Sequence, residues 1–274
     1  MIKNIVVEVS GTERDEAPLA HAARIAEMFA AHVTAVLSHT LPETVAFTEP
    51  SASIVLKEMW EESSRQADLR MEQLSPRLAK LGVSNELRRH DVFAGRAGRE
   101  LAAEVRLADL FVGSLRYETD TRSAGVAEAV LLGSGRGCLF VPPGKPAPNA
   151  YSTCLVAWNG SRESARAVAE ALPLLSSAET VIVAIVEEGA SEQAGVAAGT
   201  DIGRYLSRHG VEAEVRTVAG WHDAGEAIVN EAKMIGAQMI VMGGYGHSRL
   251  REWVLGGATR HVLTEADVPV LMAH

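Results

Sequence analysis

The chain of 274 residues has only two cysteines, Cys138 and Cys154, and no long apolar run. Both cysteines lie in apolar, strand-like segments, which predicts two buried free thiols in a reducing cytoplasm; a bridge or redox pair is the alternative. A membrane helix needs about 20 apolar residues, and the longest runs, such as 181–186, are strand-sized. The first residues enter a strand pattern directly, so we expect no signal peptide, no membrane partner and a cytoplasmic location.

Aromatic residues and positive charge are also scarce. Aromatics make up 5% of the chain, and the formal net charge is −9. A nucleic-acid-binding protein normally shows a basic stripe, often with stacking aromatic side chains, and neither is visible here. The 9 histidines show no His-x-x-x-His pair on a convincing helix. We therefore expect neither nucleic acid as the main partner nor a structural metal site.

The sequence also matches none of three phosphate-binding motifs that nucleotide enzymes use. Gly144-Lys145 does not belong to a Walker motif, because Pro146 follows it. Neither 10–13 nor 159–162 matches the Ser-Gly-Gly-x-Asp-Ser loop of ATP pyrophosphatases. A dehydrogenase fingerprint follows the first strand of its domain, whereas the glycines at 244 and 246 follow a fourth strand. The sequence thus predicts no defined enzymatic turnover, with slow ATP hydrolysis left as an alternative.

The chain contains an internal repeat: the same order of predicted strands and helices occurs twice. The two copies lie on either side of a proline-rich stretch at 141–153, which we expect to be an exposed linker. Each copy has a strand ending in a polar glycine turn, a helix, a β run, a helix end followed by a strand, a helix start and two closing strands. The corresponding segments are 5–11 and 155–161, 17–31 and 162–175, 33–37 and 180–186, 78–87 and 206–215, 97–102 and 224–229, 108–113 and 237–242, and 138–142 and 268–272.

This repetition predicts an α/β fold of two tandem doubly wound domains, each a mostly parallel five-stranded sheet flanked by helices. The expected domains are residues 1–143 and 152–274. The first copy has extra length around 48–75, which we interpret as a longer helix from Ile54 to Leu74.

Glycines gather after the fourth strand of the second copy. The apolar run 239–242 breaks into Gly243 and Gly244, Gly246 follows, and a pair at 256–257 comes after an expected helix at 248–255. Glycine lets backbone N–H groups approach an anion closely, and a helix N-terminus adds a favourable dipole. The pattern predicts a polyphosphate site; turn glycines without a ligand are the alternative.

With these motifs, the chain resembles a tandem universal stress protein over essentially its whole length. Nucleotide-binding members of that family share glycine, two residues, glycine, nine residues, glycine, then serine or threonine, and Gly243, Gly246 and Gly256 have this spacing. The turn 157–161 resembles the family's first-strand segment, and 266–271 resembles its closing strand. The resemblance implies an adenine-nucleotide alpha-hydrolase-like fold and a stress-response role. It also implies face-to-face pairing of the two copies within the chain, with a homodimer as a further option.

The resemblance also implies an adenine nucleotide (ATP, ADP or AMP), with or without Mg²⁺, in the second copy. Phosphates would lie over the glycines, and base and ribose near Asn159 and the end of the strand at 185–186. The expected nucleotide-binding residues are Asn159, Gly160, Ser161, Ile185, Val186, Met242, Gly243, Gly246, His247, Ser248, Gly256, Gly257, Ala258 and Thr259. Ser161 is in addition a good N-cap for the helix that follows it.

Two positions depart from the family pattern. Gly257 replaces the hydroxyl residue, although its backbone N–H remains and Thr259 could supply a hydroxyl or cap the last helix. Asn159 replaces an acid, so it can hydrogen-bond ribose or base but cannot bind a metal as a carboxylate would. The first copy lacks the second glycine and carries Glu118 and Asp120, so we expect it to bind no nucleotide. A nucleotide-free interaction protein remains the other alternative.

Overall fold

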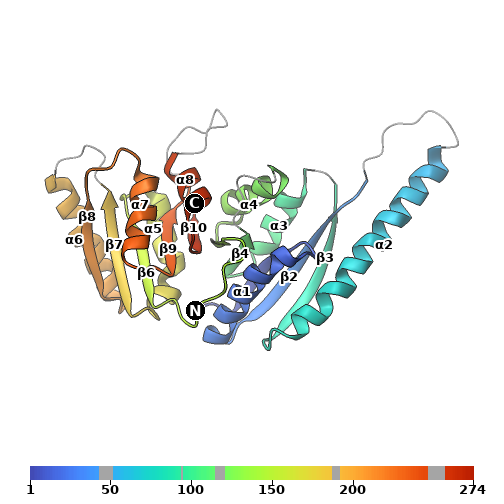
Figure 1. The fold of residues 1–274 in the computed structure, drawn as a ribbon, viewed down its shortest axis with the longest axis horizontal. Helices are drawn as coiled ribbons and strands as arrows, with labels where there is room; N and C mark the ends of the chain where they lie inside the picture. Colours follow the sequence, from blue (N-terminus) through green and yellow to red (C-terminus); the bar gives the residue numbers. More distant parts are fainter. Residues whose placement is uncertain (43–51, 94, 115–120, 187–191, 246–256) are drawn as a thin grey trace.

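The computed structural model describes residues 1–42, 52–93, 95–114, 121–186, 192–245 and 257–274. Strands and helices alternate within each half, and helices lie on both sides of the strands (Figure 1). Within the described ranges no helix is long and apolar enough to cross a membrane. The predicted α/β class with a mostly parallel sheet is confirmed.

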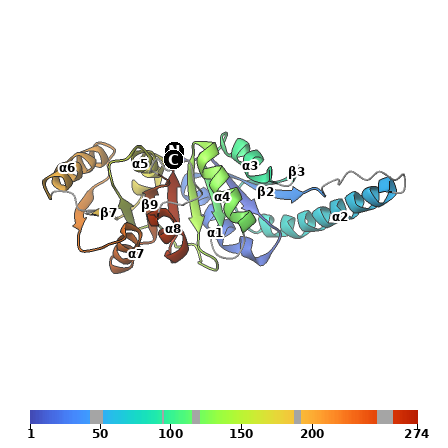
Figure 2. The ribbon, with the colours of Figure 1, turned by 90° about the horizontal axis from the view of Figure 1, so that it is seen from above.

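The first half contains five strands in parallel register. Its elements are β1 (Asn4–Val9), a 3₁₀ turn (Glu13–Asp15), α1 (Glu16–Phe29), β2 (His32–Thr40), α2 (Ala52–Ala79), β3 (Asn85–Val92), α3 (Ala97–Val105), β4 (Leu110–Ser114), α4 (Thr121–Ser134) and β5 (Gly137–Val141). Helix α2 is the extra element that the sequence predicts, and its far end extends away from the rest of the molecule in both views (Figures 1 and 2).

The second half repeats this order and is again parallel. Its elements are β6 (Thr153–Ala157), α5 (Arg162–Leu175), β7 (Thr180–Val186), α6 (Glu192–Arg208), β8 (Ala213–Val218), α7 (Ala224–Met234), β9 (Met239–Gly243), α8 (Gly257–Glu265) and β10 (Val270–Ala273). Helix α5 has the bounds that the apolar periodicity predicts. The domain boundaries proposed from sequence fall between β5 and β6 and remain a prediction.

The two halves join into one sheet through a single antiparallel pair, β5 with β10. The strand order is β3-β2-β1-β4-β5-β10-β9-β6-β7-β8, and Met272 lies opposite Cys138 while Val270 lies opposite Phe140. The halves are therefore joined edge to edge, and not face to face as expected. Each half would otherwise expose an apolar edge strand with unpaired backbone groups, and this pairing covers both edges.

Alternate residues of the central strands fill two cores, one on each face of the sheet. Leu139 and Leu271 belong to one core, which α1, α2, α5 and α6 cover. Phe140 and Met272 belong to the other, which α3, α4, α7 and α8 cover. Because each core contains residues from both halves, packing as well as strand pairing holds the halves together.

Both cysteines are buried free thiols, as the sequence predicts. Burial raises the pKa of Cys154 to about 12 and raises that of Cys138 further. Both thiols are therefore protonated near neutral pH, and neither is suited to act as a nucleophile.

Tyr151 anchors the proline-rich connection between the halves. Its side chain is 1% exposed, and its hydroxyl lies 2.7 Å from Nδ1 of His21, which is fully buried in α1. The expectation of an exposed linker therefore holds at Pro143 and Gly144 but is wrong at Tyr151. Burial is the main cause that lowers the pKa of His21 to about 4, against the opposing effect of nearby backbone carbonyls.

Acid should therefore destabilise the protein at His21. An imidazole kept neutral in the folded state contributes its full stabilisation above pH 6.5, and this is lost as pH falls from 6.5 to about 4. The loss amounts to about 3 kcal/mol in the free energy of unfolding. Urea unfolding at pH 7 and pH 4.5 measures it. His21→Gln should narrow the difference between the two pH values, whereas the same change at exposed His209 should not. An unchanged pH dependence in the His21 variant would contradict this account.

Candidate functional site

The carboxyl ends of β6 and β9 lie side by side in the second half. β6 pairs with β9 on one side and with β7 on the other. The chain leaves β6 through α5 and returns to β7, on the side away from β9. Such a topological switch point is where open α/β sheets bind their ligands. The turn after β6, the exit from β9 and the start of α8 make up the candidate site.

The turn after β6 has the geometry of a helix entry. Oδ1 of Asn159 accepts a hydrogen bond from the backbone N–H of Ser161 at 3.1 Å. Gly160 between them has a φ of +72°, which glycine adopts without strain. The hydroxyl of Ser161 accepts from the N–H of Ser164 at 3.1 Å, which confirms Ser161 as the N-cap of α5.

Gly243 brings this turn and the exit from β9 together. A Cβ on Gly243 would lie 2.6 Å from the backbone nitrogen of Ser164 and 2.7 Å from the carbonyl carbon of Glu163. The end of β9 is thus in direct contact with the first turn of α5, at a distance that only glycine permits. Two segments that are 80 residues apart in sequence therefore meet at one point, as the interpretation of a shared site requires.

Two backbone N–H groups after Gly243 already have partners. The N–H of Gly244 donates to the carbonyl of Ala273 at 2.9 Å. The N–H of Tyr245 donates to the hydroxyl of Thr259 in α8 at 3.4 Å, and Thr259 is 5% exposed. Tyr245 has a φ of +59°, a conformation that non-glycine residues seldom adopt and that is concentrated at functional sites. Thr259 therefore connects the exit from β9 to α8. It lies inside α8 and is not its N-cap, and a ligand contact of its hydroxyl, which can still donate, stays a prediction.

The remaining expected residues differ in placement. Ile185 is buried against α6, with its Cδ1 3.3 Å from where a Cβ of Gly199 would lie. Val186 and Met242 instead pack in the core on the opposite face, under α7 and α8. The side chain of Ile185 is thus directed away from α8, and the structure does not group it with the other two.

Part of the predicted glycine segment lies outside the described residues. This applies to Gly246, His247, Ser248 and Gly256, and to the expected helix at 248–255. Gly257 and Ala258 are the first two residues of α8. The N–H groups in the first turn of a helix have no partner inside that helix, so they are available to an anion or to water.

Two carboxylates lie near the site that are not among the expected nucleotide-binding residues; Asp223, in the strand exit 221–223, is a ligand-facing or a plain loop residue by sequence, and Glu163 has no assigned role. Oδ1 of Asp223 accepts from the N–H of Glu226 at 2.8 Å and so caps α7, while Oδ2 lies 3.6 Å from the Cβ position of Gly257. Glu163 is buried beside Gly243. Burial alone would raise the pKa of Glu163, but Arg162 and its own backbone N–H keep it below the ordinary value.

The helix-capping pattern could have identified Asp223 as an N-cap, since it precedes an apolar periodic stretch. Its proximity to α8 depends on how closely α7 and α8 pack, which no local pattern encodes. In the described part of the chain no three His, Cys, Asp or Glu side chains are arranged to hold a metal ion.

The first half fills its equivalent turn with a carboxylate. Ser10 and Gly11 occupy the turn after β1, and Gly11 has a φ of +80°. Oδ1 of Asp15 accepts from the backbone N–H and the hydroxyl of Ser10 at 2.9 and 2.8 Å, and Oδ2 accepts from the N–H of Gly11 at 2.8 Å. Asp15 is 4% exposed, and Arg77 lies 3.6 Å from it.

By strand register, Ser164 is the counterpart of Asp15 in the second half. The hydroxyl of Ser164 donates to the carbonyl of Ser161 and brings no charge to the turn. The first half therefore holds a resident anion against its turn amides, and the second half has an uncharged side chain at that position. That only the second half binds a nucleotide stays a prediction.

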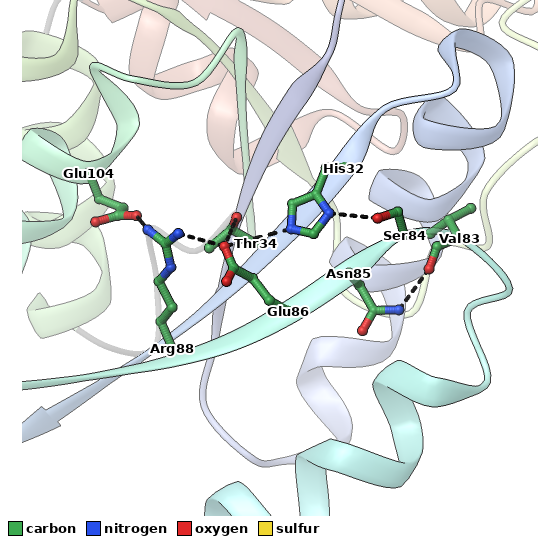
Figure 3. Close-up of polar contacts among 8 residues, drawn as sticks. All are labelled: His32, Thr34, Val83, Ser84, Asn85, Glu86, Arg88 and Glu104. Atoms are coloured by element: carbon green, nitrogen blue, oxygen red, sulfur yellow. Dashed lines mark hydrogen bonds and ion pairs between the residues drawn. The ribbon is translucent and has the colours of Figure 1, made fainter.

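A Ser–His–Glu group at the amino ends of β2 and β3 was also not anticipated (Figure 3). Ser84 Oγ lies 2.8 Å from Nδ1 of His32, and Glu86 lies 3.6 Å from its Nε2. Glu86 is already held by Arg88 at 2.6 Å and by the hydroxyl of Thr34 at 3.2 Å. A catalytic triad needs a carboxylate that orients the imidazole, whereas Glu86 is hydrogen-bonded to Arg88 and Thr34 instead. We therefore interpret this network as one that stabilises the pairing of β2 with β3.

The parallel strands, the helices between them and the strand switch point define the second half as an α/β domain of the doubly wound class. Comparison with known proteins narrows the class. Residues 150–274 match the model of the Universal stress protein family. Universal stress protein Slr1230 of Synechocystis is 37% identical over 68 residues, a match that spans 25% of this chain and only 23% of that protein.

Solved structures extend the likeness in fold to the whole chain. A universal stress protein from Archaeoglobus fulgidus is 16% identical, with a TM-score of 0.77, and the match covers 98% of this chain and 95% of that one. A Pseudomonas aeruginosa protein of unknown function is also 16% identical, with a TM-score of 0.60 and coverage of 98% and 92%. The second half of the chain is thus similar in sequence to the universal stress protein family, and the whole chain is similar in fold to solved structures of that family.

The carboxylate in the first half should be important for stability. Asp15→Asn places an amide N–H₂ group against the backbone N–H groups of Ser10 or Gly11, and should lower the free energy of unfolding by about 2–3 kcal/mol. Urea denaturation measures the loss. The neighbouring Glu16→Gln is the matched control, since Glu16 also pairs with Arg77 but is 70% exposed, and should cost less than about 1 kcal/mol. Equal losses in the two variants would contradict the role given to Asp15.

Proposed function

We propose that the chain is a stress-response regulatory protein that binds one adenine nucleotide in its second half. One observation carries the proposal: Gly243, at the end of β9, lies against the first turn of α5. This contact places the turn Asn159–Ser161 beside the exit from β9, at the switch point of the sheet. The match of residues 150–274 to the family model and the glycine spacing support an adenine nucleotide as the occupant.

Asn159 suits the ribose or the base. Its Oδ1 accepts from Ser161, so its Nδ2 is the part of the side chain left to meet a ligand, and it has no hydrogen-bond partner among the described residues. An amide N–H₂ group donates well to ribose hydroxyl oxygens and to ring nitrogens of adenine. The turn therefore presents a donor in a fixed orientation, because the Ser161 contact decides which way the amide points.

The phosphates fit better at α8 than directly over Gly244 and Tyr245. The N–H groups of those two residues donate within the protein, whereas the first N–H groups of α8 have no helical partner. Asp223 and Glu163 place negative charge on both sides of this position. Like charges disfavour a bare di- or triphosphate, so Mg²⁺ bound to the nucleotide should strengthen binding.

The direct experiment looks for the nucleotide itself. Protein purified without added ligand is denatured and the supernatant analysed for adenine nucleotides, and the folded protein is titrated with ATP, ADP and AMP, with and without Mg²⁺, by calorimetry. Asn159→Ala should weaken binding by about tenfold, the value of one well-placed hydrogen bond. Ser10→Ala, at the equivalent position of the first half, is the matched control and should leave affinity unchanged.

The alternatives predict different results. A nucleotide-free interaction protein would release no nucleotide and show no binding heat at millimolar concentrations, which would contradict the proposal. A slow ATP hydrolase would bind ATP and also release phosphate at a rate that Asn159→Ala lowers. Binding without phosphate release supports the regulatory role.

A further inference from the structure

Gly244 follows the end of β9, and its glycine identity has a cause in the first half of the chain. Its φ is not in the left-handed region, so an L-residue would fit its backbone. A Cβ at this position would, however, lie 2.9 Å from Cδ2 of Leu131 and 3.7 Å from Sδ of Met272. The space that a side chain at 244 would fill is taken by Leu131, a residue of α4.

Leu131 has little room to move. It is 1% exposed and belongs to the core that both halves share. Helix α4 leads directly into β5, which pairs with β10, and the N–H of Gly244 donates to Ala273 of β10. Leu131 therefore holds Gly244 from the side while β10 holds its backbone.

The other side of the candidate site also contacts the first half. Nη2 of Arg166 in α5 donates to the carbonyl of Gly135 at 2.8 Å. Oε2 of Glu170, one turn further, accepts from the N–H of Gly137 at 3.2 Å. Both α5 and the exit from β9 thus rest on the segment that joins α4 to β5. A first half without a glycine motif of its own still supplies the support for the site in the second half.

We infer that Leu131 is a positioning residue for the nucleotide site: it fixes Gly244, and with it the exit from β9, across the boundary between the halves. This inference rests on the proposed function. Gly243 is different, because a methyl group there would meet the backbone of Glu163 and Ser164 within its own half. The two adjacent glycines should therefore respond differently to a change at Leu131.

A size-exchange experiment on the full chain uses this difference. Leu131→Ala should weaken ATP binding by about tenfold, within the range of coupling between residues in contact. Gly244→Ala should weaken it as well, because its methyl group meets Leu131. In the Leu131→Ala background, Gly244→Ala should cost less than about twofold, since the methyl group then fills vacated space. Gly243→Ala is the control and should be equally harmful in both backgrounds.

Hydrogen exchange at the backbone amides of Gly244 and Tyr245 tests the role of Leu131 without any nucleotide. Leu131→Ala should speed exchange at Gly244 and Tyr245 by about tenfold relative to Leu101→Ala, which removes a fully buried leucine from α3 in the same half. If the wild type binds no nucleotide, the proposed function fails, and the exchange rates still decide whether Leu131 positions Gly244. Equal costs of Gly244→Ala in both backgrounds, or equal exchange in the two leucine variants, would overturn the inference.

Discussion

The antiparallel pairing of β5 with β10 is the interaction on which the rest of the structure depends. Each half is a parallel sheet whose fifth strand would otherwise be an exposed apolar edge. Pairing the two edges creates one sheet of ten strands and lets both cores run through both halves. It also places the end of α4 next to the exit from β9, which is why Leu131 reaches Gly244. Without this pair, the candidate site would lose the contact between Gly244 and Leu131.

The two halves share a fold but differ in the turn that follows their first strand. The turns after β1 and β6 each contain a left-handed glycine, Gly11 and Gly160. Asp15 satisfies the turn amides of the first half, and the uncharged Ser164 takes its place in the second. The turn of the first half thus contains a buried, hydrogen-bonded carboxylate, and the side chain at the corresponding position of the second half is uncharged.

Sequence reasoning was successful where the signal is local. Apolar periodicity gave the order of the elements, the bounds of α5 and the extra helix α2, and the side-chain chemistry of Ser161 gave its role as a cap. These features depend on residues within one or two helical turns of each other, so a single segment contains the information.

Long-range features could not be predicted in the same way. The edge-to-edge junction depends on which strands remain unpaired, and the contacts of Gly243 depend on how closely β9 approaches α5. Gly98 and Gly225 are further examples, because the sequence pattern places each of them only in a helix start. The structure shows that each allows close packing of a neighbouring helix, at Ala129 and at His261. The sequence shows where such glycines lie, but it does not indicate which distant residues pack against them.

We expect one half of this duplicated chain to bind a nucleotide and the other half to bind none. Native mass spectrometry of the full chain with saturating ATP and Mg²⁺ counts the nucleotides bound per chain most directly. We expect one nucleotide per chain, whatever the oligomeric state. Two nucleotides per chain would show that Asp15 does not exclude a nucleotide from the first half. No bound nucleotide would show that the second half is not a nucleotide site.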